Sequence, residues 1–160
     1  MPQKKENASL RAHLSLTLSW SSAHLNLEDA VKGLPAPLRG KRPRGFAHSP
    51  WELLEHIRLA QRDLLDFFRD PDYVEGDWPD AYWPDSPAPP SPRAWKKSLE
   101  AIAADREAFQ AFVKTTPDLF AEIPGHKGKT ILRSVLLAID HTSYHVGQIV
   151  MARNLLQASR

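Results

Sequence analysis

Cysteine is absent from the 160 residues of the sequence. This absence excludes a disulfide framework, a thiolate metal site and a cysteine nucleophile supplied by the chain itself. Any metal ion that the protein binds must therefore be held by histidine, aspartate or glutamate side chains.

Long apolar runs are also missing. No stretch approaches the roughly 20 consecutive apolar residues of a membrane-spanning helix. The first seven residues, Met-Pro-Gln-Lys-Lys-Glu-Asn, contain no apolar signal core. We therefore predict a cytoplasmic protein that has no membrane partner.

A strong excess of one charge is lacking as well, since the formal net charge is +2 although the sequence pI is near 9.0. Basic residues cluster in the run Arg39-Gly-Lys-Arg-Pro-Arg-Gly. No aromatic residues interleave with these charges. We therefore favour a solvated linker between helices over a phosphate-binding role, and we expect no nucleic-acid partner.

Alternating β-branched residues and internal repeats do not occur, whereas apolar residues recur at helical spacing in several segments. We expect a first helix that begins after Asn7 or Ser9, with a break near Trp20-Ser21-Ser22, and then a short helix capped by Asn26. Three longer helices should follow, from Ser49 to about Arg69, from Ser91 to Pro117, and over 130–156. With 42% hydrophobic residues, the pattern predicts an all-α four-helix bundle in a single domain spanning residues 1–160.

The clearest helix start is Ser49-Pro50-Trp51-Glu52. It offers an N-cap serine, a proline at the first helical position and a glutamate that completes a capping box. This signal sets the register of the second long helix, in which His56 lies at the edge of an apolar face.

The connection between the second and third long helices, residues 70–92, is long and rich in proline and tryptophan. Its prolines and large aromatic residues are Pro71, Pro79, Pro84, Pro87, Pro89, Pro90, Pro92, Tyr73, Trp78, Tyr82 and Trp83. Such a loop is uncommon in compact domains, and four large aromatics argue against disorder. We expect an ordered segment across the bundle that shields apolar surface, which we favour over direct substrate contact.

The last predicted helix carries His141 and His145, four residues apart. At 3.6 residues per turn both imidazoles lie on one face and can reach one metal ion. Gln148 and Ser134 fall on the same stripe. Aliphatic residues flank the stripe on both sides, with Leu137 and Leu155 on one and Ala138, Ile149 and Leu156 on the other. We therefore expect a buried polar seam.

Two ligands are too few for a divalent ion, and His56 is the leading candidate for the third. Thr142 follows His141 where zincin metalloproteases have glutamate, which excludes an enzyme of that type. Three imidazoles suit zinc best, with nickel or iron as alternatives, and they leave a position open for water or substrate.

Three further residues are candidates around the site. Gln148, one turn beyond His145, can orient a ligand through a hydrogen bond. His24, next to the break after the first helix, is expected to line the cavity. Arg106 shares the apolar stripe of the third long helix. We favour a side chain that reaches to the surface there, over a partner for a buried carboxylate or an anionic ligand.

The two motifs Ser49-Pro-Trp-Glu-Leu-Leu-Glu-His56 and Asp140-His141-Thr-Ser-Tyr-His145-Val-Gly-Gln148 resemble those of the DinB-like (DinB/YfiT) superfamily. The resemblance implies a four-helix bundle, often dimeric, with a metal site formed by His56, His141 and His145. Some relatives are transferases or isomerases that use low-molecular-weight thiols such as bacillithiol or mycothiol, and many others have no assigned activity.

Three functions follow as hypotheses. The leading one is a metalloenzyme that activates a small thiol or water, as a transferase or hydrolase acting on a small molecule. The second is a non-catalytic stress-related or small-molecule-binding protein with a structural metal. The third is an interaction module, a homodimer formed through a second apolar face of the last helix that comprises Leu132, Leu136, Ile139, Val146 and Val150.

Overall fold

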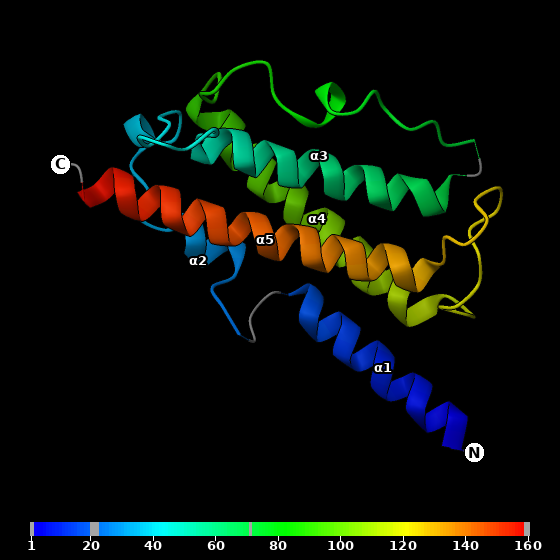
Figure 1. Ribbon diagram of the computed structural model, residues 1–160. Helices are drawn as coiled ribbons and strands as arrows, with labels where there is room; N and C mark the ends of the chain where they lie inside the picture. The colour runs from blue at the N-terminus through cyan, green and yellow to red at the C-terminus, as the bar shows by residue number, and fades with distance from the viewer. Residues whose placement is uncertain (1, 20–22, 71, 159–160) are drawn as a thin grey trace.

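A computed structural model describes residues 2–19, 23–70 and 72–158. The fold is all-α, as predicted, and the described residues contain no strand (Figure 1). The helices are α1 (Pro2–Leu18), α2 (Leu27–Val31), α3 (Pro50–Arg69), α4 (Pro92–Thr115) and α5 (Ile131–Ala158), with short 3-10 helices η1 (Ala36–Leu38) and η2 (Asp80–Tyr82). The four long helices are the four that the sequence predicts. No helix among the described residues is long and apolar enough to cross a membrane.

Local capping signals fix the helix starts. The Ser49 hydroxyl accepts from the Glu52 backbone N–H, and the Glu52 carboxylate accepts from the Ser49 backbone N–H at 2.7 Å, so the predicted capping box is present. Ser91 caps α4 and Asn26 caps α2 by a single hydrogen bond each, from the backbone N–H of Ala94 and of Asp29. Because the capping box sets where α3 begins, it also sets which of its residues face the core.

The predicted start of the first helix is wrong. α1 begins at Pro2 instead of after Asn7 or Ser9. Proline is well suited to the first helical position, and the polar residues that follow it are mostly good helix formers. The break expected at Trp20-Ser21-Ser22 lies outside the described residues.

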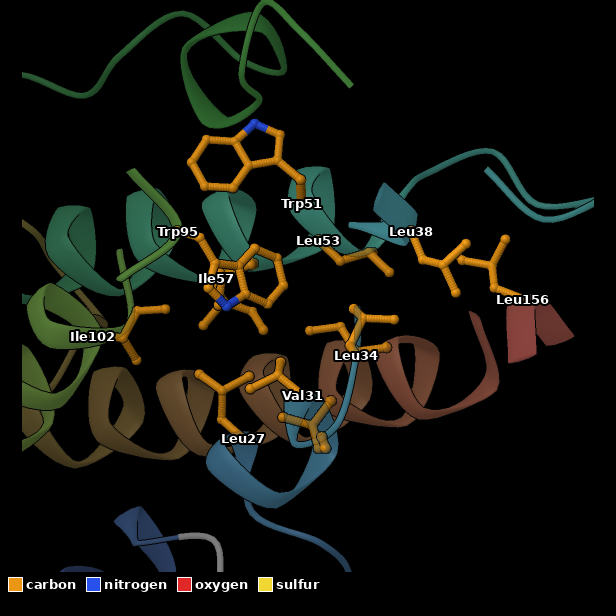
Figure 2. Close-up of a cluster of buried hydrophobic side chains, with 14 residues drawn as sticks. Leu27, Val31, Leu34, Leu38, Trp51, Leu53, Ile57, Trp95, Ile102 and Leu156 are labelled. Carbon is orange, nitrogen blue, oxygen red and sulfur yellow. The ribbon is translucent and has the colours of Figure 1, made fainter. Parts of the chain in front are cut away.

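The core consists of two apolar clusters. The larger joins α2, η1, α3, α4 and α5, and Figure 2 shows its side chains converging between α3 and α5. The second lies between α1, α3, α4 and α5 around Phe109, which is fully buried. Each fully buried large side chain stabilises the fold by about 1.5–3 kcal/mol. Both clusters hold α3 against α5 along their length.

The connection of residues 70–92 runs back along α3 on the side away from α1 (Figure 1). We call it the strap. Tyr73 and Tyr82 each donate a hydroxyl hydrogen bond to Asp63 of α3, and the Ser49 hydroxyl donates to the Pro87 carbonyl. The strap is therefore ordered, as expected. It shields only in part, because Tyr82 is buried whereas Trp78 is 71% exposed.

Candidate metal centre

The structure brings His56, His141 and His145 together, although 85 residues separate the first two. α3 supplies His56 and the adjacent α5 supplies the other two (Figure 1). One nitrogen from each ring lies within 4.8 Å of the other two. His56 and His145 are buried, and His141 is half-buried. Three imidazoles from two packed helices thus form a cluster that can hold a metal ion.

Hydrogen bonds to the outer nitrogen of two rings fix which nitrogen carries the proton. His56 Nδ1 lies 2.7 Å from the backbone carbonyl of Tyr82 in the strap. His145 Nδ1 lies 2.7 Å from Gln148 Oε1, one turn further along α5. Because oxygen is the acceptor in both pairs, each Nδ1 donates its hydrogen, and each Nε2 keeps its lone pair for the cluster.

One pair of inner nitrogens lies close to the spacing that a metal ion needs. His141 Nε2 lies 3.0 Å from His56 Nε2. In a tetrahedral zinc site with Zn–N distances near 2.05 Å, ligand nitrogens lie about 3.3 Å apart. The observed separation needs only a small adjustment to admit an ion. The donor set and its tautomers therefore fit a divalent cation.

The electrostatics of the cluster favour neutral rings. Burial, together with the neighbouring imidazoles, lowers the pKa of His141 to about 3 and that of His145 to about 4. Burial also lowers the pKa of His56, against the opposing effect of its bond to the Tyr82 carbonyl. Metal ligation requires neutral imidazole. At neutral pH all three rings are thus uncharged, as metal ligation requires.

The strap holds His56 by stacking as well. The Trp83 ring lies parallel to the His56 ring, with centroids 3.9 Å apart and an interplanar angle of 2°. His48 stacks on the other face of Trp83 at 4.0 Å and 14°. The sequence did not indicate these roles, since Trp83 is one of four large aromatics in the strap and nothing in the sequence singles out His48.

The expected seam is buried on one side only, which is a correction to the prediction. Ala138, Ile149 and Leu156 are buried, but Leu137 and Leu155 on the other flank are 38% and 40% exposed. The histidine stripe therefore lies along the border of the buried face of α5. This placement desolvates the rings and still leaves His141 accessible from one side.

Two predicted neighbours lie elsewhere, and the cluster among the described residues contains neither. His24 is exposed, and its Nδ1 bonds the carbonyl of the adjacent Leu25, so it does not line a cavity with the histidines. Arg106 forms an ion pair with Glu28 of α2 at 2.8 Å, and Glu28 is exposed, so its partner is not a buried carboxylate. Both sit on segments whose distance from the site the sequence alone does not reveal.

The basic run near residue 40 is engaged within the chain at two of its positions. Arg42 pairs with Glu52, the capping glutamate, through two hydrogen bonds. The Arg39 guanidinium lies 4.7 Å over the Trp95 ring. These contacts accord with the linker interpretation, and Glu52 is paired with Arg42 and is not part of the histidine cluster.

Comparison with known proteins agrees with this geometry. No curated protein matches the chain. The sequence model of the DinB superfamily matches residues 20–149, which include all three histidines, Gln148 and the whole strap. The chain therefore belongs to the DinB superfamily.

Proposed function

We propose that the protein is a metal-dependent enzyme whose His56, His141 and His145 hold one divalent ion, zinc in the first place and nickel or iron as alternatives. The observation that carries this proposal is the pair of fixed tautomers. Tyr82 and Gln148 take the outer protons of two rings, so their Nε2 lone pairs face the cluster. The neutral state of all three rings supports the same conclusion.

The reaction class follows from what the chain lacks. When bound to three imidazoles, a divalent ion lowers the pKa of a water or thiol at its open position. The chain has no cysteine, so a thiol nucleophile must come from a small molecule. We propose transfer of a low-molecular-weight thiol to an electrophile, with hydrolysis as the alternative, in the cytoplasm.

The protein's own residues supply orientation and access in this scheme. The strap fixes His56 by a hydrogen bond and a stacked indole, and Gln148 fixes His145. The Nδ1 of His141 has no such fixed acceptor among the described contacts, and its ring borders a surface hollow. We infer that a substrate reaches the site on the His141 side.

The test is metal content measured by mass spectrometry on protein purified without chelators and then reconstituted with zinc, nickel or iron. We expect one divalent ion per chain in the wild type and a loss of it in His141→Ala. His13→Ala is the matched control, because His13 is exposed on α1. A wild-type protein that takes up no stoichiometric ion after reconstitution contradicts the proposal.

A second measurement separates a catalytic ion from a structural one. Cobalt-substituted protein should change its visible spectrum when a small thiol is added, because an open position accepts the sulfur. A structural ion with a closed coordination shell would raise the melting temperature and leave the spectrum unchanged. That outcome would support the non-catalytic binding protein instead.

We further propose a homodimer, through a face that differs from the predicted one. Val146 of the predicted face is 1% exposed and belongs to the core. Tyr144 and Met151, seven residues apart on α5, are instead 64% and 55% exposed, and neither lines the hollow beside His141. A seven-residue apolar period suits packing against a second helix of the same kind. Light scattering should give twice the chain mass, and Tyr144→Glu should give a monomer.

A further inference from the structure

A hollow of about 250 Å³ adjoins the metal centre at His141. Three elements form it, since α3, the strap and α5 each contribute side chains. The residues that matter for its chemistry are Asp63, Glu75, Trp78, Tyr82, Leu137 and His141. Its volume is below the roughly 300–1,000 Å³ of drug-sized sites, so it suits a small ligand.

The aromatic wall comes from the strap. The rings of Trp78 and Tyr82 lie 5.3 Å apart and are tilted by 53° to each other. Trp78 is 71% exposed although tryptophan is the largest apolar side chain. An exposed tryptophan beside a tyrosine at the mouth of a hollow offers two electron-rich faces, which attract cations. Ala60, Leu64 and Leu137 supply the aliphatic part of the lining.

The charge of the hollow has one sign. Asp63 and Glu75 are its charged residues, and neither forms an ion pair within the described part of the chain. Asp63 is held in place by the Tyr82 and Tyr73 hydroxyls, which donate to the same carboxylate oxygen. Burial, together with the hydrogen bond to Asp63 and the nearby carboxylates, raises the pKa of Tyr82 to about 12, so its hydroxyl remains a donor at neutral pH.

We propose that this hollow binds a small molecule with an apolar body and a protonated amine, and that Trp78, Tyr82, Asp63 and Glu75 recognise the ammonium group. Two aromatic faces combined with two carboxylates is the chemistry that selects an organic cation. The ligand's other end then lies next to His141. Binding of the ammonium group needs no metal. The inference rests on the proposed function only in the part that the other end of the ligand would play beside the metal ion.

Basic residues near the hollow favour the alternative that it binds an anion. Lys129 and Arg133 line a smaller adjoining hollow of about 160 Å³, which also touches Asp63 and Glu75. If these cations dominated the local potential, an anionic ligand would be preferred instead. The choice between the two signs is therefore decided by matched probes that differ in charge alone.

The experiment titrates three probes that share a phenylethyl body into metal-free protein, and amide NMR shifts report the binding. The probes are 2-phenylethylammonium, neutral 2-phenylethanol and anionic 3-phenylpropionate. We expect the ammonium probe to bind about fivefold or more tightly than the alcohol. We expect the anion to bind most weakly, and the shifted amides to lie in the strap and beside His141. No binding, equal binding of all three, or preference for the anion would each overturn the proposal.

Two variants localise the effect. Glu75→Gln should weaken the ammonium probe about threefold and leave the alcohol unchanged, since an exposed carboxylate contributes modestly. Glu107→Gln on α4 is the matched control, because Glu107 is exposed and lines no part of the hollow. Trp78→Ala should weaken both the ammonium and alcohol probes. Equal effects of Glu75→Gln and Glu107→Gln would also contradict the site.

The same titration on zinc-loaded protein separates this inference from the proposed function. If the metal-free protein selects the ammonium probe but takes up no zinc, the proposed ammonium site is supported and the enzyme proposal is contradicted. If zinc is taken up and the protein does not prefer the ammonium probe, only the proposed ammonium site is contradicted.

Discussion

Gln148 offers the sharpest test of the metal centre, because its single hydrogen bond can be removed or strengthened without changing the ligands. Its Oε1 lies 2.7 Å from His145 Nδ1, and its side chain is half-buried at the border of α5. We expect Gln148→Leu to weaken zinc binding and Gln148→Glu to strengthen it. The fold should tolerate both changes.

The expected change in zinc affinity follows from how much stronger the hydrogen bond to Gln148 is in the metal-bound state than in the metal-free state. A neutral hydrogen bond is worth about 1 kcal/mol, and one to a charged group about 1.5–3 kcal/mol. The bound ion draws electron density from the imidazole, so the Nδ1–H bond to Gln148 strengthens on binding. Its loss should therefore cost about 1–2 kcal/mol of binding free energy, which is roughly a 5- to 30-fold weaker Kd. A carboxylate acceptor should tighten binding by a similar factor.

The assay is competition for zinc against a chromophoric chelator at pH 7.4, with the melting temperature of the metal-free protein as a fold check. Asn154→Asp is the matched control for Gln148→Glu, since it makes the same amide-to-carboxylate change on α5 without a bond to a ligand ring. The reasoning is refuted if Gln148→Leu binds zinc as tightly as the wild type. It is refuted equally if Asn154→Asp tightens binding as much as Gln148→Glu.

Three more predictions test the surroundings of the site. Trp83→Leu should weaken zinc binding about tenfold, because His56 loses the stacked ring that restricts it, and the same chelator competition measures this. The metal-free protein should lose stability as the pH falls from about 6.5 towards 4. In this range His141 and His145 bind protons in the unfolded chain but stay neutral in the native state, because their pKa values are lowered there. The slope of the unfolding free energy in urea titrations should approach 1.4 kcal/mol per pH unit for each ring and be smaller in a double His→Asn variant. Ser49→Ala should destabilise the fold by about 1 kcal/mol in the same titrations, through loss of the capping box.

Local signals made much of this molecule predictable. The capping box at Ser49 and the proline at position 50 set the start of α3, and that start places His56 in the interior. The four-residue spacing of His141 and His145 placed both on one face of α5. These inferences succeed because a helix register depends on a few neighbouring residues. The adjacency of α3 and α5 was the one long-range step, and the shared chemistry of the three histidines suggested it.

The parts that failed depend on contacts between distant segments. Trp83 is 27 residues from His56, and no periodic pattern governs a proline-rich strap, so its stacking could not be derived from spacing. The exposed flank at Leu137 and Leu155 was missed because an aliphatic side chain does not reveal whether a neighbour covers it. Asp63 had a signal that was overlooked. It lies two turns after His56 on the same face of α3, where a carboxylate is unusual.

Tyr82 connects the three features that the site depends on. Its carbonyl accepts from His56, its hydroxyl donates to Asp63, and its ring forms part of the hollow beside Trp78. A ligand that displaces the backbone of Tyr82 also moves the carbonyl that orients a metal-binding imidazole. Ion and ligand should therefore influence each other's affinity, and by thermodynamic linkage the two effects must be equal. The strap is thus part of the site rather than a cover over it.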